Sequence, residues 1–153
     1  MTTTAVSVLS PPLATSPGNT LVWEGLSGCA DALALAAAAT QSNSLLVIVT
    51  ADPNAALRLE QELAFFLDEQ APVLHFPDWE TLPYDVFSPL PEIVSQRLEI
   101  LARLPQTQRG VLVLAAASLM QRVGPRSHIS ANTFALKLGD ALNINDTSSR
   151  LES

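Results

Sequence analysis

The chain has 153 residues, about the size of one domain, and 48% of them are hydrophobic while 15% are charged. This composition excludes an intrinsically disordered chain. A net charge of −7 with only eight Lys and Arg residues argues against a nucleic-acid-binding groove within this chain, because phosphate contacts need clustered positive side chains.

The single cysteine, Cys29, excludes an internal disulfide and suits a reducing compartment. The start of the chain lacks the basic residues of a signal peptide. No apolar run reaches the roughly 20 residues of a membrane span. We therefore expect a cytoplasmic protein without membrane contact.

Residues 1–19 are rich in proline and hydroxyl side chains, which predicts a flexible leader. The fold is expected to begin with a strand over 20–24, a glycine turn and an alanine-rich helix over 29–40. The apolar run 44–50 is typical of a strand in a parallel sheet that is covered on both faces.

A second helix is predicted after Asp52, a good capping residue, with Pro53 in its first turn. Arg58 and Glu62 are four residues apart on its polar side. The apolar residues follow helical spacing and should be buried: Ala56, Leu59, Leu63, Phe66 and Leu67.

A third strand is predicted over 73–76 and a fully apolar strand over 110–115, followed by a short helix over 116–122. Between these strands, Pro91 opens a helix whose expected buried stripe is Ile93, Val94, Leu98 and Leu101. The residues expected on its exposed side are Glu92, Gln96, Arg97 and Arg103. Alternating strands and helices predict an α/β domain with a mostly parallel sheet and helices on both faces.

The pattern changes after Pro125. Residues 133–138 alternate like a half-exposed strand, and residues 145–153 look like the beginning of a capped helix. One strand and part of a helix cannot form a core, so we expect residues 125–153 to be the start of a small α+β module. The chain is then a piece of a longer protein.

The stretch 76–89 holds four of the eight aromatic residues and three of the eleven prolines, and no hydrophobic period fits it. It should be a shaped loop in which Trp79, Tyr84 and Phe87 pack against the domain. Stacking of these rings on nucleic-acid bases is the alternative, which the lack of a basic groove disfavours.

The turn after the first strand has part of a phosphate-binding P-loop, G-x-x-x-x-G-K-S/T. Gly25 occupies the first position and Gly28 an inner one. The required Gly, Lys and Ser/Thr are replaced by Ala30, Asp31 and Ala32. An aspartate at the lysine position would repel a triphosphate, so a plain glycine turn without a bound cofactor is favoured over a nucleotide site.

The carboxylates Asp78, Glu80 and Asp85 could in principle hold a metal or act as acid and base. No His or Cys recurs at ligand spacing around them, so loop capping is favoured and no catalytic or metal-binding residue is assigned. Cys29 and Met120 are expected to be buried. Arg122 and Arg126 are a close basic pair that could contact an anion or nucleic acid, although a plain domain-junction surface is favoured.

Several segments together resemble the N-terminal region of the bacterial transcription-repair coupling factors (Mfd). They are the loop 78–89, Ser95 with Arg97 and Leu98, the segment 108–113 and the segment 118–123. The resemblance extends from about residue 20 to the end, and its signature loop residues are Asp78, Trp79, Glu80, Leu82, Pro83, Tyr84, Asp85, Phe87, Ser88 and Pro89. That region is in turn similar to the repair helicase subunit UvrB, with a degenerate P-loop.

The resemblance implies a function. Members of this family release RNA polymerase stalled at DNA lesions by ATP-driven translocation on double-stranded DNA, and they recruit the repair protein UvrA. Their ATP- and magnesium-dependent motor would lie beyond residue 153. Residues 20–124 would form the first half of a degenerate helicase-like domain, whose sheet a later part of the chain completes. Residues 125–153 would begin the UvrA-binding insert.

This chain would then be a non-catalytic scaffold module. Two alternatives remain open: a small P-loop-like nucleotide-binding enzyme that uses the turn from Gly25 to Gly28, and an acidic hydrolase built on Asp78, Glu80 and Asp85.

Overall fold

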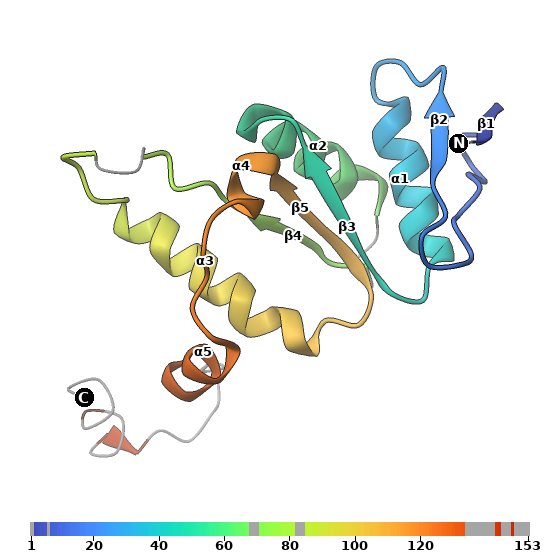
Figure 1. Cartoon of the computed structure of the whole chain (residues 1–153). Helices are drawn as coiled ribbons and strands as arrows, with labels where there is room; N and C mark the ends of the chain where they lie inside the picture. Colours follow the sequence, from blue (N-terminus) through green and yellow to red (C-terminus); the bar gives the residue numbers. More distant parts are fainter. Residues whose placement is uncertain are drawn as a thin grey trace.

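The computed structural model describes residues 2–5, 7–67, 71–81, 85–133, 143–144 and 148. In these residues strands and helices alternate along most of the chain (Figure 1). The elements are β1 (Thr2–Ala5), β2 (Leu21–Glu24), α1 (Ala30–Gln41), β3 (Leu45–Thr50), α2 (Pro53–Phe66), β4 (Val73–Phe76), α3 (Pro91–Arg103), the short 3-10 helix η1 (Leu104–Gln106), β5 (Gly110–Ala115), α4 (Ala116–Leu119) and α5 (Arg126–Asn132).

The main sheet is parallel and has the strand order β3-β5-β4. Leu45 pairs with Gly110 on one side of β5, and Val73 pairs with Val111 on the other. All six residues of β5 are buried, as expected for an apolar strand in the middle of a parallel sheet.

Helices cover both faces of the main sheet. Helices α1 and α2 pack on one face, where Ala36, Leu59 and Leu63 meet the β5 residues Val111 and Val113. The α3 residue Ile100 packs on the other face, in a cluster with Leu74, Phe76, Leu112 and Leu114. These two layers confirm the predicted α/β class with a parallel sheet.

Helix α2 also confirms its local predictions. The Asp52 carboxylate caps its start, accepting from the Ala55 amide at 2.9 Å, and Pro53 is its first residue. The predicted stripe faces inward: Ala56, Leu59 and Leu63 are buried, and Phe66 and Leu67 are packed against the same core.

Strand β3 differs from the prediction that both faces are covered. Leu46 and Ile48 pack on the core of α1 and α2, whereas Val47 and Val49 remain 52% and 47% exposed. Because side chains alternate along a strand, these two valines lie on the α3 side of the sheet. Helix α3 packs mainly over β4 instead. On this side of β3, Leu45 packs against the α3 cluster, whereas Val47 and Val49 are left exposed.

The first predicted strand is present as β2, but it pairs with β1 in a two-stranded parallel sheet of its own. Strand β1 lies within residues 1–19, the segment predicted as a flexible leader. Trp23 Nε1 donates to the Pro12 carbonyl oxygen at 3.2 Å, and Pro11 is buried. Part of the predicted leader is therefore packed against β2.

Four side-chain predictions outside the loop 76–89 are wrong. On α3 the buried residues are Ile93, Arg97 and Ile100, spaced i, i+4 and i+7, so Arg97 is buried and Leu98 is exposed. Cys29 and Met120 are exposed because they lie at the outer ends of α1 and α4.

The C-terminal part is only partly described. Helix α5 was not predicted, and the predicted strand 133–138 and helix 145–153 lie almost entirely outside the described residues. Within the part of the chain that the structure describes, every helix is too short or too polar to cross a lipid bilayer.

A substitution of Gly110, the first residue of β5, tests the packing around the central strand. Its φ is +117°, and a Cβ atom there would collide with the Pro72 carbonyl oxygen, which accepts from the Val111 amide at 2.9 Å. We expect Gly110→Ala to lower the free energy of unfolding by about 3 kcal/mol in urea titrations followed by circular dichroism.

Gly18→Ala is the matched control, because Gly18 also has a positive φ, +83°, but a Cβ atom added there would meet no other atom within 4 Å. It should cost only about 1 kcal/mol. Equal losses in the two variants would contradict the close approach of Pro72 to β5.

Candidate functional site

The glycine turn leads from β2 into α1. Gly25 and Gly28 both adopt left-handed backbone conformations, with φ of +79° and +63°, which glycine accommodates without strain. Helix α1 begins two residues after Gly28, at Ala30, and Asp31 lies in its first turn. The turn therefore has the strand-turn-helix order of a phosphate loop, with a carboxylate where the loop needs a lysine.

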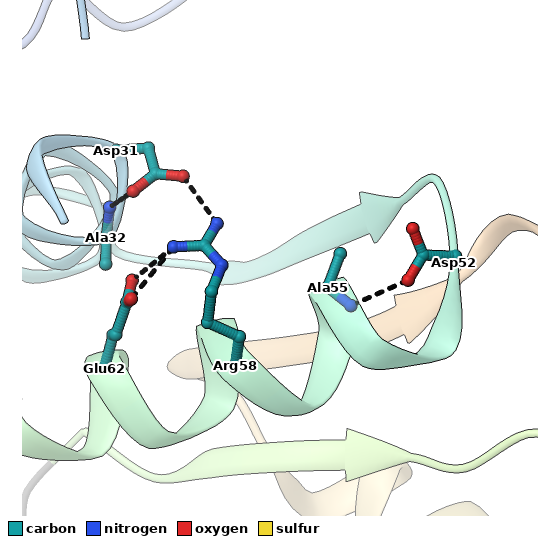
Figure 2. Close-up of polar contacts among 6 residues, drawn as sticks. All are labelled: Asp31, Ala32, Asp52, Ala55, Arg58 and Glu62. Carbon is teal, nitrogen blue, oxygen red and sulfur yellow. Dashed lines mark hydrogen bonds and ion pairs between the residues drawn. The ribbon is translucent and has the colours of Figure 1, made fainter. Parts of the chain in front are cut away.

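The Asp31 carboxylate occupies the start of α1. Its Oδ1 accepts from the Ala32 amide at 2.8 Å, and its Oδ2 lies 3.0 Å from Nη2 of Arg58 on α2 (Figure 2). A free amide at a helix start is the group that would bind a phosphate oxygen. In this chain a side chain of the protein already binds it.

Arg58 is shared between two carboxylates. Besides Asp31, its Nη1 donates to both oxygens of Glu62, at 2.9 and 2.8 Å (Figure 2). The hydrogen bond to Asp31 and, to a smaller extent, those to Glu62 raise the pKa of the Arg58 guanidinium. The group is exposed, so water screens the pairs, and their role is to fix local geometry more than to stabilise the fold.

Ligands of parallel α/β sheets usually bind at the carboxyl ends of the strands. Asp52 follows β3, Asp78 follows β4, and β5 is followed by Ala116. Asp52 is used as the α2 cap (Figure 2). Asp78 accepts from Gln121 Nε2 at 2.6 Å and from Ser118 Oγ at 3.3 Å.

Both carboxylates at this sheet edge therefore make structural hydrogen bonds. Among the described residues, no group of three or more His, Cys, Asp or Glu side chains has an arrangement that could hold a metal ion. Asp78, Glu80 and Asp85 are thus not gathered into a metal-ligating group.

Arg97 is a charged residue whose burial the sequence did not reveal. Its guanidinium lies between the rings of Phe76 and Trp79, 4.1 Å from each centroid. Nη1 donates to the Pro77 carbonyl oxygen, and the residue is only 2% exposed. We call Phe76, Trp79 and Arg97 the arginine clamp. It fastens the first part of the loop 76–89, which we call the aromatic loop, to α3.

Burial lowers the pKa of the Arg97 guanidinium, and the negative charge of Asp78 opposes that shift. Arginine remains protonated in proteins, so the clamp carries a buried positive charge with Asp78 as its counter-charge. Arg97 Nη2 and Gln121 Oε1 are buried and have no hydrogen-bond partner among the described residues.

The rest of the signature loop is more open. Asp85 Oδ1 accepts from the Val86 amide at 2.9 Å, and Ser88 is exposed while Pro89 is half-buried. Phe87 is 76% exposed, so the prediction that it packs against the domain is wrong. Glu80 has a positive φ of 57°. Leu82, Pro83 and Tyr84 lie outside the described residues.

The predicted basic pair is exposed. Arg126 begins α5, while Arg122 lines a cavity of about 210 Å³ beside the arginine clamp, together with His128 and Ile129. The lining of this cavity is otherwise mostly apolar. Contact of Arg122 and Arg126 with an anion or nucleic acid stays a prediction.

Arg97→Ala tests the clamp. Removing the guanidinium loses two stacked rings and leaves the Pro77 carbonyl oxygen without its donor, so we expect a loss of about 3 kcal/mol in urea unfolding. Arg103→Ala is the control on the same helix, since Arg103 is exposed and pairs with the exposed Glu99, at 3.1 Å. It should cost less than about 0.5 kcal/mol. Similar losses would contradict the clamp.

The amino-acid sequence was compared with family models and with characterised proteins. No family model matches the chain. The chain is 38% identical over 143 residues to the transcription-repair-coupling factor of Haemophilus influenzae, which covers 94% of this chain and 12% of that protein. It is 40% identical over 128 residues to the Escherichia coli protein of the same name, covering 84% of this chain and 11% of that protein.

The transcription-repair-coupling factor of Myxococcus xanthus is 34% identical over 140 residues, covering 88% of this chain and 12% of that protein. The chain thus spans about one eighth of the length of the relatives that it matches. The similarity runs through 84–94% of this chain, so nearly the whole chain matches one small part, the N-terminal region, of transcription-repair-coupling factors.

Proposed function

We propose that this chain is a non-catalytic scaffold module from the N-terminal region of a transcription-repair-coupling factor. The longer protein would release RNA polymerase stalled at DNA lesions and recruit nucleotide excision repair through UvrA. The observation that carries the non-catalytic part is the Asp31 carboxylate, which binds the Ala32 amide at the start of α1.

The chemistry of a P-loop supports this proposal. A working loop supplies free backbone amides, a lysine for the β- and γ-phosphates and a hydroxyl for magnesium. Here the amide of Ala32 is bound by Asp31, the lysine is absent, and Arg58 already binds two carboxylates. A triphosphate would have to displace the Asp31 carboxylate before it gained a hydrogen bond from the Ala32 amide.

A division of labour follows. Residues 20–124 would be the first half of a UvrB-like, degenerate helicase domain, and residues 125–153 would begin the UvrA-binding insert. ATP hydrolysis with magnesium, translocation on DNA and the contact with RNA polymerase would belong to other parts of the longer cytoplasmic protein. This chain would contribute surfaces held in place by the α/β core.

Nucleotide binding by this chain is the second candidate. One observation favours it: Arg58 Nη2 lies 3.0 Å from Asp31 Oδ2, so the repulsive charge of Asp31 has a cation beside it. If a nucleotide displaced Asp31, Arg58 could pair with its phosphates. The two candidates therefore differ in whether Asp31 or a phosphate binds the start of α1.

Titration calorimetry with ATP and magnesium separates them. We expect no saturable heat from the natural chain. The variant Ala30→Gly, Asp31→Lys, Ala32→Ser restores the P-loop pattern and is the matched comparison, with the fold of both proteins checked by circular dichroism. Micromolar binding by the natural chain that is lost in Arg58→Ala would contradict the scaffold proposal and establish the second candidate.

A binding assay with UvrA tests the proposed partner of this chain. Purified UvrA is titrated against this chain and against a longer piece of the same protein that includes the residues after 153. We expect the longer piece to bind at least about tenfold more tightly, because most of the insert would follow residue 153. Failure of both pieces to bind UvrA would refute the proposed recruitment role.

A further inference from the structure

Strand β4 has one free edge. It pairs in parallel with β5 through Val73–Phe76, and among the described residues no strand pairs with its opposite side. The backbone N–H and C=O groups along such an edge are available to another strand. Pro72 and Pro77 flank β4, so the available stretch is confined to these four residues.

A groove follows this free edge. It has a volume of about 480 Å³ and is lined by the β4 residues Val73, Leu74 and His75. One wall comes from α2 and includes Leu57, and the opposite wall comes from α3 and includes Ile93. Helices α2 and α3 lie on opposite sides of the sheet (Figure 1). The groove between them therefore lies where the next strand of the same sheet would lie.

The walls are partly apolar. Leu57 is about half-exposed on α2, while Ile93 and Ile100 reach the groove from α3. Successive side chains of an added strand would point in turn toward α2 and toward α3. The groove can therefore give an extended peptide both main-chain hydrogen bonds and apolar contact on each side.

The groove is acidic. Among the described residues that line it are four carboxylates, those of Glu60, Asp78, Glu80 and Glu99, and one guanidinium, that of Arg103. His75 Nδ1 lies 2.8 Å from Glu60 Oε2, and Arg103 pairs with Glu99. Glu60 lies on the α2 wall and Glu99 on the α3 wall, so negative charge flanks the β4 edge on both sides.

The negative charge of the groove determines which kind of molecule can bind along the free edge of β4. A second copy of the chain would bring the same acidic groove and a net charge of −7, and nucleic acid would bring phosphates, so both would be repelled. We propose that the free edge of β4 binds an extended, basic peptide segment of a partner protein by strand addition, with Lys or Arg side chains facing Glu60 and Glu99.

The probe is the capped hexapeptide Lys-Lys-Val-Val-Lys-Lys, which as a strand presents both Lys and Val to each wall, and it is titrated into the ¹⁵N-labelled 153-residue chain. We expect saturable shifts of the amide signals of Val73–Phe76 and slower hydrogen exchange along β4. The same peptide methylated at every backbone amide keeps its charge but cannot add as a strand, so it should not bind. The same hexapeptide with Glu in place of every Lys should not bind either.

Glu99→Lys reverses one charge on the groove wall at an exposed position, so it should weaken the Lys-Val peptide about threefold without affecting the fold. Glu24→Lys makes the same charge change at the exposed end of β2, which does not line the groove, and should leave the affinity unchanged. Equal binding of the methylated peptide, equal effects of the two variants, or shifts that bypass Val73–Phe76 would overturn the proposal.

Discussion

The complete burial of β5 is the constraint on which the rest of the described structure depends. Its six residues bond to β3 on one side and β4 on the other, while its side chains alternate between the core of α1 and α2 and the core of α3. Because a central strand of apolar residues is covered on both faces, β5 determines where the helical layers lie. Helices cover the outer strands only in part. As a result, Val47 and Val49 are exposed on β3 and a groove runs along the free edge of β4.

Polar groups around the sheet are mostly bound by the protein itself. At the start of α1 the Asp31 carboxylate takes the amide that a phosphate would need. At the ends of β3 and β4, Asp52 caps α2 and Asp78 accepts from Gln121. The arginine clamp buries a charge to fasten the aromatic loop. These hydrogen bonds hold loops and helix ends in fixed places. Such an arrangement suits the proposed scaffold role better than a catalytic role.

Sequence signals that act locally predicted the structure well. Helix α2 has its cap, its proline and its apolar spacing within one segment, and β5 is an unbroken apolar run. The predictions that failed concern side chains whose partners are distant in the sequence. The helical spacing predicts that Arg97 is exposed, but in the structure Phe76 and Trp79 stack on its guanidinium. Arg58 pairs with Asp31, which lies 27 residues away in the sequence. The exposure of Val47 depends on which strand α3 covers, which no local pattern encodes.

The proposed scaffold role depends on the protein's own carboxylate filling the phosphate position at the start of α1. The most direct measurement is the ¹⁵N amide spectrum of the natural chain during titration with magnesium pyrophosphate, observed at Ala30, Asp31 and Ala32. We predict that these three signals stay in place up to millimolar ligand. Saturable movement of the Ala32 signal would show that a phosphate displaces Asp31, and it would contradict the scaffold role.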